Sequence, residues 1–241
     1  MLNFGFKRLF SLFLLFSSTT MLIAEEIPVE EFFCDSALSG VTLSPDGKKY
    51  AALVPINGPA CAVEEDDDPQ SARVLLVMDL ETKKPIILSG TADYARIVQF
   101  FWLNDDRIGF YKQPTRGLDA YDLWAIDIDG KNLKKLVPGK WEDGYATGAR
   151  VSFLMDDDPD HVLVEYNKRR PKYTDIYKLN IYSGRLTTLA IDPVLGNNTL
   201  MGWAIDQQGN VRGYMAMDGL KYKLYHRTVS YTHLTLPTTL Q

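Results

Sequence analysis

Residues Asp119–Val137 read DAYDLWAIDIDGKNLKKLV, and this stretch decides the fold. From Trp124 to Ile128 the side chains alternate between two faces, one more apolar than the other, and a period of two indicates a β-strand. The pair Asp129-Gly130 tolerates positive φ and is typical of a tight hairpin turn. The sequence therefore predicts a strand, a turn, and a returning strand over residues 133–137.

The same unit occurs twice more. It is found at Val74–Leu88 (VLLVMDLETKKPIIL) and at Asp175–Leu189 (DIYKLNIYSGRLTTL). Asp79, Asp127 and Asn180 hold equivalent positions in the three copies, 48 and 53 residues apart. This is the pattern of a repeat protein.

Each of the three copies closes a longer unit of four predicted strands. A fourth unit, with three predicted strands, follows them. These units cover residues 41–88, 97–137, 151–191 and, with three strands only, 201–225. Their first turns fall at Asp46, Asp105, Asp158 and Gln208, spaced by 59, 53 and 50 residues. Four-stranded units at a period of ~40–50 residues are typical of β-propeller blades.

The alternative fold is an ordinary β-sandwich with evenly spaced turns. Trp102 and Trp203 occupy matching positions on the first strand of their units, and this repetition favours a propeller. We therefore predict an all-β chain that forms an incomplete β-propeller of about three and a half four-stranded blades. A propeller needs ~4–8 blades to close its ring, so part of the ring is missing.

The first 24 residues have the layout of a secretory signal peptide. Lys7 and Arg8 precede an apolar run over Leu9–Phe16, and small residues lead to Ala24, after which cleavage is expected. The alternative is an uncleaved membrane anchor, but the run is short for a span of ~20 residues. The mature chain is thus expected to be exported, to the periplasm or the extracellular space, without a stable membrane span.

The last residues, 229–241, have a different composition. They are rich in Thr and Leu (SYTHLTLPTTLQ from Ser230) and resemble the translated sequencing-adapter tails that end many truncated reading frames. The alternative is a genuine tail or edge strand. We predict a signal peptide over residues 1–24, a partial propeller domain over residues 25–228, and a non-native tail over residues 229–241.

Two cysteines, Cys34 and Cys61, lie in the exported part. In an oxidising compartment they could form a disulfide, worth ~3 kcal/mol in the loop-entropy account. Two unpaired buried thiols are the alternative. Their spacing fits no zinc pattern, so a metal role is not expected.

No set of residues predicts catalysis, cofactor binding or metal binding. The sequence contains no G-x-S-x-G motif, and its histidines, His161, His226 and His233, fall on strands or in the tail. The acidic run Asp156–Asp160 is expected to form a blade turn. The basic run Lys168–Arg170 is expected in a solubilising loop, although it could meet a substrate carboxylate or a second domain. The net charge of −5 argues against a nucleic-acid partner.

The chain resembles the start of exported prolyl oligopeptidase-family serine peptidases, which include dipeptidyl and acylaminoacyl peptidases. The resemblance rests on the signal peptide, on VTLSPDGKKYAALVP at Val41–Pro55, and on blade ends such as DLWAIDIDG at Asp122–Gly130. It implies a propeller that admits peptides to a C-terminal α/β-hydrolase domain, in which a Ser, an Asp and a His carry acyl transfer. That domain is absent from this chain.

Two functions follow as hypotheses. In the first, the chain is the substrate-gating propeller fragment of a secreted serine peptidase that hydrolyses short peptides, its partners being those peptides and the missing hydrolase domain. In the second, it is a stand-alone exported propeller that binds or scaffolds, like the propeller of the Tol-Pal system. The first rests on the resemblance and not on any residue that does chemistry here.

Overall fold

The computed structural model describes residues 38–56, 73–88, 97–113, 120–193 and 199–226, together with the backbone of residues 235–238. These residues form strands and turns, and within them there is no helix that could span a membrane. The strands make four four-stranded antiparallel sheets and one two-stranded hairpin, and each larger sheet takes its strands in chain order.

The first sheet contains β1 (Ser39–Leu43), β2 (Lys49–Pro55), β3 (Arg73–Asp79) and β4 (Pro85–Ile87), and the second β5 (Ile97–Asn104), β6 (Arg107–Lys112), β7 (Asp122–Asp127) and β8 (Lys134–Val137). A hairpin of β9 (Lys140–Glu142) and β10 (Tyr145–Thr147) follows. The third sheet contains β11 (Ala149–Leu154), β12 (His161–Arg170), β13 (Tyr173–Asn180) and β14 (Leu186–Ala190). The fourth contains β15 (Thr199–Ile205), β16 (Val211–Asp218), β17 (Lys221–His226) and β18 (Thr235–Thr238).

The fourth sheet differs from the sequence-based expectation. We expected the fourth unit to stop after its third strand, but β18 pairs antiparallel with β17, with Leu224 opposite Thr238 and His226 opposite Thr235. A Thr-rich segment has a high propensity for strands, and β17 offers it a free edge. The suggestion that residues 229–241 are non-native stays a prediction.

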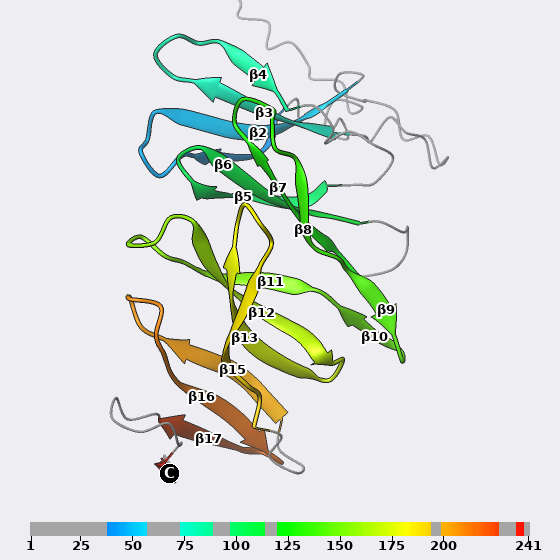
Figure 1. Cartoon of the computed structure of the whole chain (residues 1–241), viewed down its shortest axis with the longest axis vertical. Helices are drawn as coiled ribbons and strands as arrows, with labels where there is room; N and C mark the ends of the chain where they lie inside the picture. The colour runs from blue at the N-terminus through cyan, green and yellow to red at the C-terminus, as the bar shows by residue number, and fades with distance from the viewer. Residues whose placement is uncertain are drawn as a thin grey trace, which may run out of the picture.

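The sheets stack face to face as blades do. In Figure 1 they follow one another along the long axis, with β1–β4 at one end of the stack and β15–β18 at the other. The alternation predicted for β7 explains the stacking. Leu123 and Ala125 join the core shared with β11–β14, whereas Ile126 joins the core shared with β1–β4, with Trp124 packed against it. The prediction of an all-β propeller fold is confirmed.

Apolar side chains also cover the outer faces of the two end sheets. On the first sheet Leu43 is 62% exposed and Ile87 is 59% exposed. On the fourth sheet Met215, Tyr222 and Leu224 are exposed on one face. Neighbouring blades cover equivalent faces inside the stack, so both end faces have the character of blade–blade interfaces.

The short turns of all four sheets lie at one end of the blades, which we call the turn end. It comprises residues 44–48, 80–84, 105–106, 128–133, 155–160, 181–185 and 206–210. Contacts between sheets hold these turns together: the Asp46 amide donates to Asp105 Oδ1 at 2.9 Å, and Asn104 Nδ2 donates to the Pro159 carbonyl at 3.0 Å. The predicted first turns are therefore confirmed, and they touch one another.

Two of the repeat positions cap their turns in the same way. Asp79 Oδ1 accepts hydrogen bonds from the Thr82 amide at 2.7 Å and the Thr82 hydroxyl at 3.0 Å. Asn180 Oδ1 accepts from the Ser183 amide at 2.7 Å and the Ser183 hydroxyl at 2.8 Å. These are turn caps in which a short polar side chain satisfies the backbone, and they account for the sequence repeat.

The third repeat position, Asp127, instead binds Arg107. The Arg107 guanidinium is 1% exposed and forms an ion pair with Asp127. It also donates to the Ile181 carbonyl at 2.9 Å and the Asn132 carbonyl at 3.1 Å. Because Ile181 follows β13, this one side chain joins the second sheet to the third.

The described residues of the remaining connections lie at the opposite end, which we call the connection end. They are residues 56, 88, 113, 120–121, 138–148, 171–172, 191–193 and 219–220. The predicted signal peptide, both cysteines of the possible Cys34–Cys61 disulfide and His233 fall outside the described residues.

Candidate functional site

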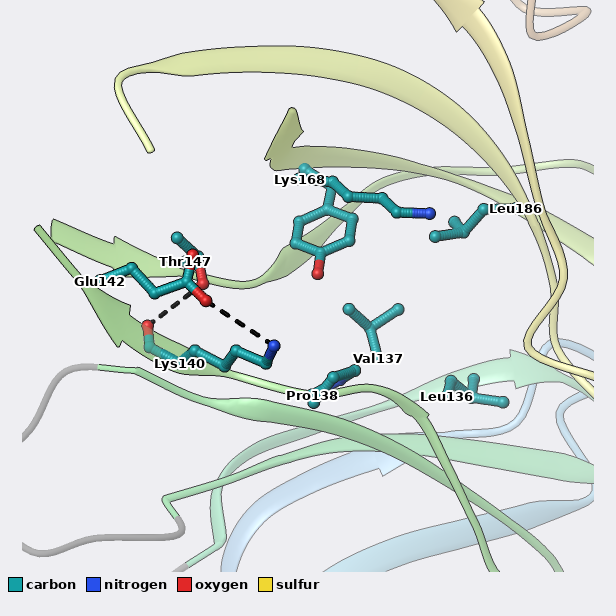
Figure 2. Close-up of a pocket in the computed structure, with 9 residues that line it drawn as sticks. Leu136, Val137, Pro138, Lys140, Glu142, Thr147, Lys168 and Leu186 are labelled. Carbon is teal, nitrogen blue, oxygen red and sulfur yellow. Dashed lines mark hydrogen bonds and ion pairs between the residues drawn. The ribbon is translucent and has the colours of Figure 1, made fainter. Parts of the chain in front are cut away.

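A cavity of about 410 Å³ opens at the connection end between the second and third sheets. Figure 2 shows it framed by β8, the β9–β10 hairpin, β12 and β14. Its lining is Leu136, Val137, Pro138, Lys140, Glu142, Thr147, Tyr166, Lys168 and Leu186. The lining thus combines an apolar wall with two lysines, a carboxylate and two hydroxyls.

The β9–β10 hairpin forms one side of the cavity, and its turn explains its shape. Glu142 pairs with Tyr145, so Asp143 and Gly144 are the two loop residues. Their φ values are +50° and +79°, the left-handed pair that a type I′ turn requires. We did not predict this hairpin, although the Asp-Gly pair between two short alternating segments was the signal for it.

Both ends of the hairpin are fixed to the neighbouring sheets. The Gly139 amide donates to Asp122 Oδ1 on β7 at 2.8 Å, and the Gly148 amide donates to Asn167 Oδ1 on β12 at 3.0 Å. A Cβ at Gly139 would lie 2.5 Å from the Tyr121 carbonyl carbon, so only glycine fits. The hairpin therefore bridges two blades and forms one side of the cavity between them.

The polar groups on the hairpin side are partly paired with one another. Lys140 Nζ lies 3.7 Å from Glu142 Oε1, and the Thr147 hydroxyl donates to the Lys140 carbonyl at 3.2 Å, as the dashed lines in Figure 2 mark. Both charged side chains are more than half exposed, so their attraction is screened by water.

On the β12 side, the Tyr166 hydroxyl and the Lys168 ammonium have no partner in the described part of the chain. Tyr166 is 8% exposed, and its ring packs against Tyr177 with centroids 6.0 Å apart. Burial, and then the negative charge of Glu142, raise the pKa of the Tyr166 phenol, so it keeps its proton at neutral pH. Within the described residues the Tyr166 hydroxyl makes no hydrogen bond and the Lys168 ammonium makes no ion pair.

The basic run Lys168–Arg170 lies in a strand and not in a loop, which corrects the sequence-based expectation. All three residues belong to the end of β12. Arg169 donates to both carboxylate oxygens of the buried Asp175, at 3.0 and 3.1 Å, and this structural pair raises the pKa of the Arg169 guanidinium. Lys168 lines the cavity, whereas Arg170 is exposed at the strand end.

Comparisons with known proteins find a related peptidase sequence and solved structures with a similar fold. The chain is 27% identical to dipeptidyl aminopeptidase BIII of Pseudoxanthomonas mexicana over 167 residues, which are 68% of this chain and 21% of that relative. Its structure matches a protein assigned as a dipeptidyl aminopeptidase IV from Bacteroides ovatus with a TM-score of 0.54 and 14% identity, covering 85% of this chain and 34% of the other. The resemblance to the propeller part of the prolyl oligopeptidase-family peptidases is confirmed.

A further match is the β-propeller domain of a protease from Pyrococcus furiosus, at 14% identity and a TM-score of 0.37, covering 85% of this chain and 72% of that domain. No family model matches the chain. The chain spans about a fifth of the length of the curated relative that it matches, 21%.

No catalytic triad is assembled in the described part of this prolyl oligopeptidase-like propeller. His161 Nδ1 lies 2.8 Å from Asp158 Oδ1, but its other ring nitrogen meets Asn180 Nδ2 at 3.2 Å and no serine. Asp158 also pairs with Lys178 at 2.6 Å, and these contacts lower the pKa of its carboxyl. His161 heads β12, as expected from the sequence, and its contact with Asp158 fastens the turn before that strand.

Among the described residues of the propeller, no group of histidine, cysteine and carboxylate side chains could hold a metal ion.

Asp156–Asp160 lie in the turn between β11 and β12, where the Asp158 amide donates to the Met155 carbonyl at 3.1 Å. The turn predicted for this acidic run is thus observed. Trp141, on β9, is 49% exposed.

Proposed function

We propose that the chain is the substrate-admitting propeller of an exported serine peptidase that hydrolyses short peptides. In this proposal the Ser, Asp and His that carry acyl transfer belong to an α/β-hydrolase domain outside these 241 residues. The propeller would limit which substrates reach that domain and would itself form no covalent bond to them.

The observation that carries the proposal is the 27% identity to a dipeptidyl aminopeptidase over 167 residues, together with the propeller fold of this chain. The absence of any G-x-S-x-G motif from the sequence supports placing the nucleophile elsewhere. The apolar outer faces of the two end sheets support further blades in the intact protein.

The proposal is tested by comparing the product of the complete gene with this 241-residue chain, using chromogenic dipeptide substrates and the same dipeptide sequence at the N-terminus of a folded protein. The complete product should release chromophore and should process the folded protein at least ~100-fold more slowly, since propellers leave only a narrow entry. This chain alone should be inactive.

The matched control replaces the serine of the downstream G-x-S-x-G motif with alanine, which should abolish hydrolysis without unfolding the protein. Hydrolysis by this chain alone would contradict the proposal. A complete product without peptidase activity would instead favour the stand-alone binding or scaffolding propeller.

A further inference from the structure

The cavity between the second and third sheets holds two polar groups that no residue of the described chain satisfies. Tyr166 is 8% exposed, and its hydroxyl, which is not among the fully buried atoms, makes no hydrogen bond within the described residues. Lys168 lines the same cavity from the same strand, and in Figure 2 its side chain extends toward Leu186. Lys168 is exposed, and both groups face the cavity as donors without an acceptor in the described chain, so together they can bind a ligand that accepts hydrogen bonds.

The charges around the cavity favour an anion. Glu142 lies beside Lys140, and their charges largely offset each other at 3.7 Å. Lys168 then leaves one positive charge without a counterion in the described chain. Because the Tyr166 phenol keeps its proton, it donates a hydrogen bond and does not repel a negative ligand.

The rest of the lining requires an apolar body on the ligand. Four aliphatic or proline side chains form one wall: Leu136, Val137, Pro138 and Leu186. A volume of about 410 Å³ lies at the small end of the range of ~300–1,000 Å³ for ligand pockets. The occupant is therefore a short segment with one charged end and an apolar side chain.

We propose that this cavity binds the C-terminal carboxylate of a short peptide whose last side chain is apolar. Lys168 Nζ and the Tyr166 hydroxyl donate to the carboxylate, and the apolar wall receives the side chain. The choice of a peptide rests on the proposed function, whereas the preference for an apolar carboxylate rests on the cavity alone. From the sequence, a substrate carboxylate was considered as a partner of the run Lys168–Arg170, whereas Tyr166 and the apolar wall had no assigned role.

The test measures binding directly, so that its failure is distinct from failure of the peptidase proposal. The probe is N-acetyl-alanyl-leucine with a free carboxylate, titrated calorimetrically into the product of the complete gene. Its C-terminal amide is the matched control ligand. The acid should bind at least ~10-fold more tightly than the amide, since a hydrogen-bonded charge contributes ~1.5–3 kcal/mol and each ~1.4 kcal/mol is tenfold.

Variants locate the site. Lys168→Gln and Tyr166→Phe should each weaken binding of the acid, about tenfold and about threefold, and should leave binding of the amide unchanged. Arg170→Gln is the matched control, because Arg170 ends the same strand but does not line the cavity. Equal affinity for acid and amide, no binding of the acid at millimolar concentration, or wild-type affinity in Lys168→Gln would each overturn the inference.

Discussion

The turn end and the connection end of the blades differ in how their polar groups are satisfied. At the turn end, the side chains of Asp79 and Asn180 cap the turns that directly follow their strands. Arg107 is buried there and donates to three oxygen acceptors. At the connection end, the Tyr166 hydroxyl and the Lys168 ammonium face a cavity without partners in the described chain. The connection end also has satisfied groups, such as the Arg169–Asp175 pair, but these two donors at its cavity are available to a ligand.

The largest expected effect is at Arg107. Arg107→Ala removes a buried side chain that binds Asp127 and the carbonyls of Ile181 and Asn132, and it leaves these acceptors without their donor. Breaking such a network should lower the free energy of unfolding by about 3 kcal/mol. Urea denaturation of the purified protein measures the change.

Arg150→Ala is the matched control for Arg107. Arg150 pairs with Glu165 at 2.7 Å, but its side chain is 73% exposed, so the loss should stay below ~1 kcal/mol. Equal losses in the two variants would show that the turn end is not specially stabilised by its buried arginine.

Gly139 tests whether the bridging hairpin holds the cavity. In Gly139→Ala the new Cβ would collide with the Tyr121 backbone, so the hairpin must shift, at a cost of about 2 kcal/mol. Affinity for the acetyl dipeptide should fall at least ~10-fold. In Gly202→Ala, where a Cβ meets nothing within 4 Å, both quantities should stay close to wild type. A neutral Gly139→Ala would mean that the hairpin does not shape the cavity.

The pH dependence of stability should come in part from the turn end. At Asp206, burial works to raise the pKa, but hydrogen bonds from Asn210 and Arg212 outweigh it and lower the pKa from 3.8 to about 2. A depressed folded-state pKa gives stability that is present above pH 3.8 and is lost as the pH falls through about 2. Unfolding measured between pH 5 and about 2 should therefore depend less steeply on pH in Asp206→Asn; identical slopes would contradict this assignment.

The smallest expected effect is at Glu142 on the cavity rim. Glu142→Gln removes the negative charge beside Lys140 and should tighten binding of the acetyl dipeptide acid about twofold, since exposed charges interact weakly. Binding of the amide should not change. Weaker binding of the acid would show that its carboxylate does not bind near Glu142.

The turn end could be predicted from the sequence because its information is local. The positions of Asp46, Asp105, Asp158 and Gln208 fixed the blade period, and the alternation around Trp124 defined the two faces of the second sheet. In each case the residues that form a turn or strand lie within a few positions of one another.

The cavity could not be predicted in the same way. Its lining comes from β8, the β9–β10 hairpin, β12 and β14, so it exists only after two blades stack. Tyr166 follows the alternation of a core strand, and Lys168 belonged to a run expected in a loop. Only the Asp143-Gly144 pair could have predicted part of the site, because an Asp-Gly pair between two short strands is typical of a tight hairpin turn.

The most direct test of the account is the genomic reading frame beyond the codon for Thr228. The account predicts that the native frame continues through further blades into an α/β-hydrolase domain with a G-x-S-x-G serine, an aspartate and a histidine. A native frame that keeps residues 229–241 and then stops would contradict the peptidase proposal and leave an exported propeller that acts by binding.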